Sequence, residues 1–333
     1  MALRRFRSAA VLVVLVLAGP HLQTAPADTS DDKATPATAQ SPSQSLPIAA
    51  ICIPGAKANL LAPFQPYRQK MGDSAIDWSA KELVAVGRSE QEYGGSSGAL
   101  MARRAAELLA LRNAMALASG VRIGPEGRVE NLPQGQVILE GCLKDYKIAN
   151  VHSRTTRGQT YWYAEARVPL FGVSGLSARF YDAQIQSQVP SGVNRAPWPP
   201  ADASPRGDVL VIDARSCDFQ MSMYPTLVSQ DGRVLLDMQT AGREVAINVG
   251  PCAAACTGLP FEKLKTAGLE SGQAGPTRIL VKATAAQGAA RTVLVISDAD
   301  AGRLLADPAA ASAVRGGRVV IVVKEPAFSH VAS

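Results

Sequence analysis

Histidine is scarce in this sequence, and the signature motifs of the common enzyme classes are absent. The chain has three histidines, and only His152 and His330 lie beyond the N-terminal leader described below. It contains no P-loop, no G-x-G-x-x-G opening a helix, no H-E-x-x-H and no histidine cluster with metal-ligand spacing. No catalytic residue, cofactor-binding residue or metal ligand can be assigned, so we expect a protein that is not an enzyme and uses no cofactor.

An apolar run long enough to span a bilayer, about 20 residues, is also missing. The chain begins with a cluster of arginines, continues with the short apolar run Ala9–Gly19, and reaches an A-x-A triplet that ends at Ala27. These three parts predict a cleaved secretory signal peptide, residues 1–27. Pro20 stands where a lipoprotein would carry its acylated cysteine. We therefore expect a periplasmic or secreted protein, with peripheral association to the outer membrane left open.

Strong net charge is lacking as well. The formal charge of +6 includes three arginines in the leader, so the mature chain would carry +3. No basic cluster stands out along the sequence. Such a weak field argues against nucleic acid as a partner.

Cysteine is sparse, with five residues in the chain. Export permits disulfides, but an odd number leaves at least one thiol unpaired or bonded to another chain. Cys252 and Cys256 frame the stretch CAAAC. On a helix, that spacing holds the two Cβ atoms about 5–6 Å apart, which is too wide for a bridge. Cys252, Cys256 and Cys217 remain candidates for a disulfide whose pairing is open.

Composition divides the chain into segments with different expected roles. After the signal peptide, residues 28–47 are rich in Ser, Thr, Ala and Pro and predict a disordered tether. The expected units that follow are a first module (48–186), a proline-rich linker (187–207), a second domain (208–325) and a C-terminal tail (326–333). Trp198 is unusual in a linker and is expected to dock on a neighbouring surface.

The first module predicts one helix on an antiparallel sheet, which is an α+β fold. Its expected elements are a strand at 81–88, the helix Ala99–Ser119, strands within 134–151 and 160–170 with a hairpin at Gly158, and a closing helix at 176–186. Residues 46–77 are expected to be irregular chain packed on this module. In the strand at 160–170, Tyr161 and Tyr163 alternate with the apolar positions and are expected on the polar face.

The start of the helix supports two interpretations. Gly94-Gly95-Ser96-Ser97-Gly98 has the G-x-S-x-G spacing of a hydrolase nucleophile elbow, with His152 as the available base. It also has the small polar residues of a helix N-cap. A polar stretch separates Ser96 from the preceding strand and no oxyanion loop is evident. We favour the cap, formed by Ser96 or Ser97.

The helix itself predicts a broad apolar face toward the sheet. The expected members are Leu100, Met101, Leu108, Leu111, Met115 and Ala118. Arg103 and Glu107 should pair on the opposite side. Arg104 and Arg112 lie at the edge of the apolar face, where their stems could cover the sheet or their heads could meet a partner. The candidate interface residues are therefore Tyr161, Tyr163, Arg104 and Arg112.

The sequence of the second domain predicts an α+β fold, with an α/β fold as the alternative. Several of its strand candidates are apolar at every position, which indicates burial on both faces. Asp231-Gly232 predicts a hairpin turn, and Ser297 or Asp298 predicts a helix start in preference to a metal site. Asp213 and Arg215, at the end of a strand, could form a structural ion pair or a binding feature. A short helix is expected near residue 262.

Residues Leu83 to Leu176 resemble a bacterial envelope family, the twenty-kilodalton membrane-associated lipoproteins, and the related N-terminal modules of flagellar assembly proteins. The segments that carry the resemblance are AVGRSEQEYGGSSGALMARRAAELLALRNAMALASGVRI, VILEGCLKDYKIANV and YWYAEARVPLFG. This resemblance implies a non-enzymatic envelope component that packs against envelope or flagellar proteins or against its own copies. The missing lipid-attachment cysteine departs from the lipoprotein pattern.

The second domain is similar to a region that follows this module in some exported bacterial proteins. The matching positions are Gly207, Ile212-Asp213-Ala214-Arg215, Pro225, Asp231-Gly232-Arg233, Ser297, Ala299-Asp300-Ala301 and Val320-Ile321-Val322. We therefore expect a structural or assembly protein. A periplasmic small-ligand binding module and a serine hydrolase using Ser96 remain the alternatives.

Overall fold

A computed structural model describes residues 51–125, 127–131, 139, 141, 146–187, 193–200, 207–267 and 276–325. The expected signal peptide, the tether, Cys142, His330 and the C-terminal tail from residue 326 lie outside these residues. Within the chain, residues 45–333 group into one compact unit.

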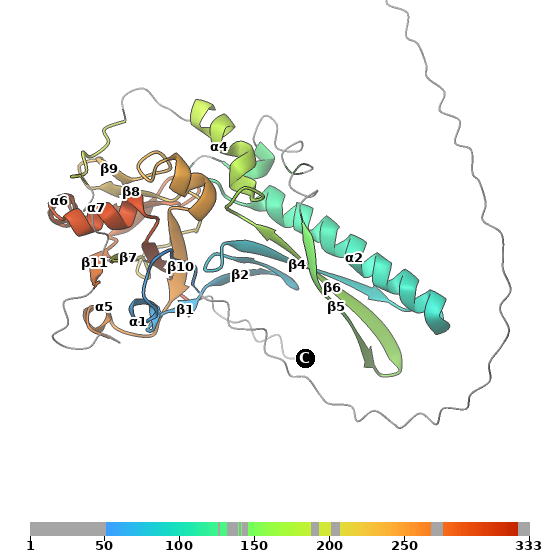
Figure 1. The fold of residues 1–333 in the computed structure, drawn as a ribbon. Helices are drawn as coiled ribbons and strands as arrows, with labels where there is room; N and C mark the ends of the chain where they lie inside the picture. Colours follow the sequence, from blue (N-terminus) through green and yellow to red (C-terminus); the bar gives the residue numbers. More distant parts are fainter. Residues whose placement is uncertain are drawn as a thin grey trace, which may run out of the picture. The chain divides into compact units, whose positions relative to one another are not determined.

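The first module is an antiparallel five-stranded sheet with one long helix on one face, which confirms the predicted α+β fold (Figure 1). The strands, in their order across the sheet, are β2 (Arg68–Met71), β3 (Ser74–Asp77), β4 (Glu82–Glu90), β6 (Gln159–Pro169) and β5 (Lys147–Thr156). Helix α2 (Gly95–Gly120) lies over β4 and β6, and helix α4 (Leu176–Ser187) follows the sheet. The β5–β6 hairpin turns at Arg157 and Gly158, both with positive φ.

Two segments of the module differ from the sequence interpretation. Residues 68–77 form the β2–β3 hairpin rather than irregular chain, because Gly72 adopts a positive φ and lets the chain reverse within two residues. The strand expected within 134–151 begins only at Lys147, and both Leu139 and Gly141 are helical. Short strands interrupted by glycine and proline give no sustained alternation, so the sequence pattern could not show them.

The segment that leads into the module packs on the second domain instead. Strand β1 (Gln65–Pro66) pairs with a strand of that domain, and helix α1 (Ala58–Leu61) buries Leu60 in the same cluster as Val209. The expectation that this segment covers the first module is therefore wrong.

The second domain is built on a largely parallel sheet. The order across it is β1, β10 (Cys252–Cys256), β14 (Val319–Val322), β7 (Val209–Asp213) and β11 (Arg278–Lys282), and all pairs except β1–β10 are parallel. Every residue of β7, β10 and β14 is buried. Along β7, Leu210 and Ile212 join one apolar cluster while Val209 and Val211 join another. Burial on both faces is the reason these strands are apolar throughout, as predicted.

A smaller sheet and several helices complete this domain. Its strands, in order, are β12 (Ala285–Gln287), β13 (Val293–Ile296), β8 (Thr226–Ser229) and β9 (Val234–Leu236). The helices are α5 (Phe261–Leu264), α6 (Asp298–Leu305), α7 (Pro308–Arg315) and the π-helical turn η2 (Val245–Val249), while the short 3-10 helix η1 (Val129–Asn131) belongs to the first module. Ser297 caps α6 by accepting the amide of Asp300 at 3.1 Å, which confirms that predicted helix start.

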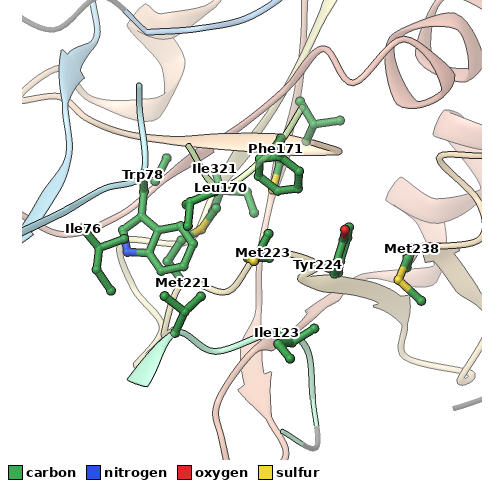
Figure 2. Close-up of a cluster of buried hydrophobic side chains, with 14 of the residues drawn as sticks. Ile76, Trp78, Ile123, Leu170, Phe171, Met221, Met223, Tyr224, Met238 and Ile321 are labelled. Carbon is green, nitrogen blue, oxygen red and sulfur yellow. The ribbon is translucent and has the colours of Figure 1, made fainter. Parts of the chain in front are cut away.

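One apolar core extends through both parts of this unit. Figure 2 shows Ile76 of β3 and Trp78, the residue after this strand, in the same cluster as Leu170 and Phe171, which follow β6, and Ile321 of β14. The cluster also contains the buried residues Ile123, Met221, Met223, Tyr224 and Met238. The first module is thus stabilised by burial against the second domain.

The expected docking of Trp198 is confirmed. Its indole Nε1 donates to the carbonyl of Leu235 at 2.8 Å, and the ring packs against the apolar core. Arg195 forms an ion pair with Asp237 at 2.8 Å. The part of the proline-rich segment between residues 193 and 200 therefore lies on the second domain.

Candidate functional site

Helix α2 presents large apolar side chains to solvent. Leu100, Met101, Leu108 and Leu109 are exposed by 64%, 57%, 51% and 37%, and we call these four residues the outer stripe. Met101 and Leu108 are seven residues apart, which is two helical turns, so they lie on one line along the helix. Large apolar side chains that are exposed together along one side of a helix are a candidate interaction site.

The opposite face of α2 is made of alanine. Ala102, Ala106, Ala110 and Ala114 recur every four residues and are at most 5% exposed. They lie close to Gly87 of β4, where a Cβ atom would approach the Ala106 carbonyl oxygen to 2.1 Å. Helix and strand backbones are therefore in near contact. No space remains at this contact for leucine or methionine, so the large side chains of this part of the helix point outward, whereas Leu117, nearer its C-terminal end, is buried.

This arrangement overturns the predicted buried face of the helix. Leu100, Met101 and Leu108 are exposed, Leu111 and Met115 are half-buried, and only Ala118 of the predicted set is buried. Alanine and leucine both count as apolar in a periodicity, so the pattern could not show which face meets the sheet. The four-residue alanine spacing, together with a glycine in the preceding strand, was the available signal.

Arginines flank and interrupt the outer stripe. The predicted pair is present, with Arg103 Nε 3.2 Å from a Glu107 oxygen, and Arg104 Nη1 lies 3.0 Å from the other oxygen. Arg104 follows Met101 by three residues and Arg112 follows Leu108 by four, so both lie on the same side of the helix as the stripe. Both are exposed. The face thus combines leucine and methionine with an excess of positive charge.

The predicted interface residues are divided between two surfaces. Tyr161 and Tyr163 alternate with the β6 residues that face α2, so they lie on the other face of the sheet. There the Arg88 guanidinium lies 4.1 Å from the centroid of the Tyr161 ring, and His152 stacks on Tyr163 with 5.3 Å between centroids. Arg104 and Arg112 are on α2. The four residues therefore form no single site.

Ser96 neither caps the helix nor faces the histidine that a hydrolase would need. The helix begins at Gly95 with Gly94 as the N-cap and no side-chain cap bond, so the predicted serine cap is wrong. A Cβ atom on Gly98 would lie 1.9 Å from the Tyr93 carbonyl oxygen, which explains a glycine in this turn. His152 shares the open sheet face with Tyr163, whereas Ser96 begins the helix on the other face.

A pocket of about 460 Å³ lies where the two parts of the unit meet. Its lining includes Lys81, which is 7% exposed and has a φ of +60°. The Lys81 ammonium donates to the carbonyls of Val249 at 2.9 Å and Gly250 at 3.3 Å. Burial lowers the pKa of Lys81 to about 8. No sequence motif pointed to this lysine, because its burial depends on residues more than 160 positions away.

Asp213 and Arg215 form the structural ion pair that was one of their two predicted roles. Arg215 donates to both carboxylate oxygens of Asp213, at 2.9 and 2.7 Å, and to the carbonyls of Thr257 and Leu259 at 3.1 and 2.7 Å. Burial alone would raise the pKa of Asp213, but the bonds from Arg215 hold it below its usual value. The arginine thereby fixes the chain that leaves β10.

The cysteines predicted to form a disulfide are free thiols in this structure. Cys252 and Cys256 are at the two ends of β10, where four residues of extended strand separate their Cα atoms by about 13 Å. A bridge between them would require less than about 7 Å. The thiol of Cys217 lies 3.5 Å from the carbonyl oxygen of Ala283. A local bridge within CAAAC is excluded because this stretch is a strand, while pairing with another chain stays a prediction.

The described residues contain neither a cluster of metal ligands nor a membrane-spanning helix. No group of three or more His, Cys, Asp or Glu side chains is placed to hold a metal ion. No helix in the described part of the chain has the length and apolar character needed to cross a bilayer.

Residues 209–325 match a family model described as the second domain of Tp0624 from Treponema pallidum. The matched range begins with β7 and ends after β14, so it contains every parallel strand of the main sheet. It covers about a third of the 333 residues and leaves α2 and its sheet outside. No curated protein sequence matches the chain.

Proposed function

We propose that this protein is an exported, non-catalytic assembly component of the bacterial cell envelope, and that α2 binds an acidic amphipathic helix of another envelope protein. The observation that carries the proposal is the outer stripe. A helix that contacts its sheet mainly through alanines, with Leu117 as the one large buried side chain among its described residues, has no folding reason to expose two leucines and a methionine by more than half. Burial of such side chains by a partner is favourable by about 25 cal/mol per Å².

The charges on α2 favour a different protein over a second copy. If two copies paired antiparallel about Leu108, Arg104 of one would face Arg112 of the other. In a parallel pairing, each arginine would face itself. Both arrangements bring positive charges together, which opposes association. A partner helix with leucines and acidic residues on one face would bury the outer stripe with its leucines and form ion pairs with Arg104 and Arg112.

The resemblance of Leu83–Leu176 to envelope lipoproteins and flagellar assembly modules supports an envelope setting for this interaction. The signal-peptide pattern of residues 1–27 agrees with export. Flagellar proteins are accordingly one group of partners to test, beside other surface assemblies.

In-cell photocross-linking tests the proposal. A photoreactive residue at position 108 should give one discrete adduct with an acidic envelope protein. The adduct should be lost when Arg104→Glu and Arg112→Glu are combined, because the partner's acids would then be repelled. The same probe at Val173, which is 85% exposed but far from α2 in sequence, is the matched control and should give no adduct.

Three outcomes would contradict the proposal. An adduct between two copies would indicate self-association through α2. Cross-linking to lipid would indicate a membrane surface. An adduct that survives the double charge reversal would show that the arginines do not select the partner.

A direct assay separates this function from serine hydrolysis. A fluorophosphonate probe should leave position 96 unlabelled, and Ser96→Ala should leave the cross-link at position 108 intact. Labelling at Ser96 that disappears in His152→Ala would establish the hydrolase instead.

A further inference from the structure

The turn before β4 forces Lys81 inward. The Asp77 carboxylate accepts the amides of Ser79 at 3.1 Å and Ala80 at 2.8 Å, and the next residue, Lys81, adopts the left-handed conformation. That conformation costs about 1 kcal/mol or more for a residue with a side chain, and glycine would avoid it. A lysine held at a strained position, with its charge buried, indicates a role for the charge.

The ammonium of Lys81 donates fewer hydrogen bonds to the protein than it has protons. Two of its three protons have acceptors, the carbonyls of Val249 and Gly250. The structure shows no third hydrogen bond from this ammonium to a described residue, and the thiols of Cys252 and of Cys52, which also lines the pocket, interact with it electrostatically. The Phe171 ring centroid lies 5.9 Å away and adds a favourable cation–π contact. The ammonium therefore retains one donor in a wall of the pocket.

The remaining walls define what could occupy the pocket. Its apolar lining comes from Ile51, Ile53, Pro54, Pro169, Phe171 and Val249. The acidic group in the lining, Glu82, forms an ion pair with Arg167 at 2.8 Å, so its charge is compensated. Asn248 lies at the exposed edge and donates to Glu244 at 2.8 Å. One cation thus lines a small space whose other walls are apolar side chains, the charge-compensated Glu82 and the thiol of Cys52.

We infer that this pocket binds a small monoanion with a short apolar body, such as an aliphatic carboxylate, with the carboxylate accepting the free proton of Lys81. One ammonium matches one negative charge, whereas a phosphate dianion would need further donors. An alkylammonium would meet the lysine charge and is excluded by the same geometry. The site is separate from the α2 surface and does not depend on the proposed partner.

Isothermal titration of the purified protein with sodium butyrate tests this inference, with 1-butanol and butylammonium chloride as matched probes. Butyrate should bind at one saturable site and raise the melting temperature in a dose-dependent way. The alcohol and the amine should bind at least tenfold more weakly. Sodium chloride at equal concentration serves as the ionic control.

Two variants locate the site. Asn248→Trp should fill the pocket mouth, leave the fold intact and abolish binding of butyrate. Lys81→Met should abolish it by removing the charge, while Lys282→Met, which removes a lysine of the second domain that does not line the pocket, should not change it. If 1-butanol bound as tightly as butyrate, the site would be an apolar cavity that does not recognise the carboxylate, and the inference would be overturned. Undiminished butyrate binding by folded Asn248→Trp would overturn the assignment.

Discussion

At the scale of single residues, buried cations in this protein hold main-chain carbonyls. Arg278 is 3% exposed and donates to the carbonyls of Asn59, Leu60, Leu264 and Ala267 at 2.6–2.8 Å, so it satisfies the ends of α1 and α5. Arg318 serves the end of α7 in the same way through Ser312. A sequence shows that such arginines are present, but their acceptors become neighbours only in the fold.

Lys81 predicts an unusual pH dependence of stability. Its pKa falls from 10.5 to about 8 on folding, so between these values the unfolded chain binds more protons and stability rises with pH. The full shift corresponds to roughly 3 kcal/mol. Burial raises the pKa of Cys252 to about 12, which acts in the opposite direction above pH 9.

The contribution of Lys81 is therefore measured as a difference. Urea unfolding of wild type and Lys81→Met between pH 7.5 and 10 should show the wild type gaining stability relative to the variant as pH increases. A difference that stays constant over this range would show that the lysine titrates normally.

Replacement of Gly87 by any residue with a side chain should destabilise the protein, because the backbone of α2 lies directly against this glycine. A Cβ atom there would lie 2.1 Å from the Ala106 oxygen and 2.2 Å from the Ala110 nitrogen, both main-chain atoms that can move only with the helix. Gly87→Ala should cost about 1–3 kcal/mol or more in unfolding free energy. Gly120→Ala, with open space around it, should change stability by less than about 0.5 kcal/mol in the same denaturation experiment.

At the scale of elements, the sequence indicated type more reliably than orientation. The strands β7 and β14 were predictable because full burial demands apolar residues, and β13 and the central residues of β11 are apolar as well. Helix α2 was predictable because glycines precede a long run of helix formers. Its orientation was not, since the contact with Gly87 depends on size rather than on polarity. The CAAAC strand was missed because alanine has little β-propensity.

The two predicted helix caps differ in a way that denaturation can measure. Ser297 accepts the amide of Asp300, so Ser297→Ala should lower the unfolding free energy by about 1 kcal/mol. Ser96 has no such bond, because the N-cap of α2 is Gly94. Ser96→Ala should therefore change stability by less than about 0.5 kcal/mol. Equal losses in the two variants would mean that Ser96 does support its helix.

At the scale of the whole unit, residues 45–333 share contacts that a linear division of the chain could not show. Ser79 of the first module donates to the Ala254 carbonyl of β10 at 2.5 Å, and the Gly172 amide donates to Ile247 of η2 at 2.8 Å. The candidate site was partly predictable: Arg104 and Arg112 were identified, Leu100, Met101 and Leu108 were assigned to the core, and Leu109 and Lys81 were missed. Both errors concern contacts between segments distant in sequence.

The shared core predicts one cooperative unfolding transition rather than two. Calorimetry, circular dichroism and tryptophan fluorescence should give coincident midpoints. Ser79→Ala should shift that single transition by about 1–3 kcal/mol, because it removes the donor to Ala254 and the acceptor of the Tyr67 amide at 2.7 Å. Ser153→Ala on the exposed β5 strand is the control. Separate midpoints would show that the two parts fold independently.

The contact of α2 with its sheet through Ala102, Ala106, Ala110 and Ala114 has a consequence for how this protein can evolve. Since small residues on the inner side anchor the helix, Leu108 and Met101 can be substituted one after the other in evolution, and each intermediate protein still folds. Substitutions on the exposed side of this one helix can therefore change which partner binds, in evolution or by design, while the fold stays the same.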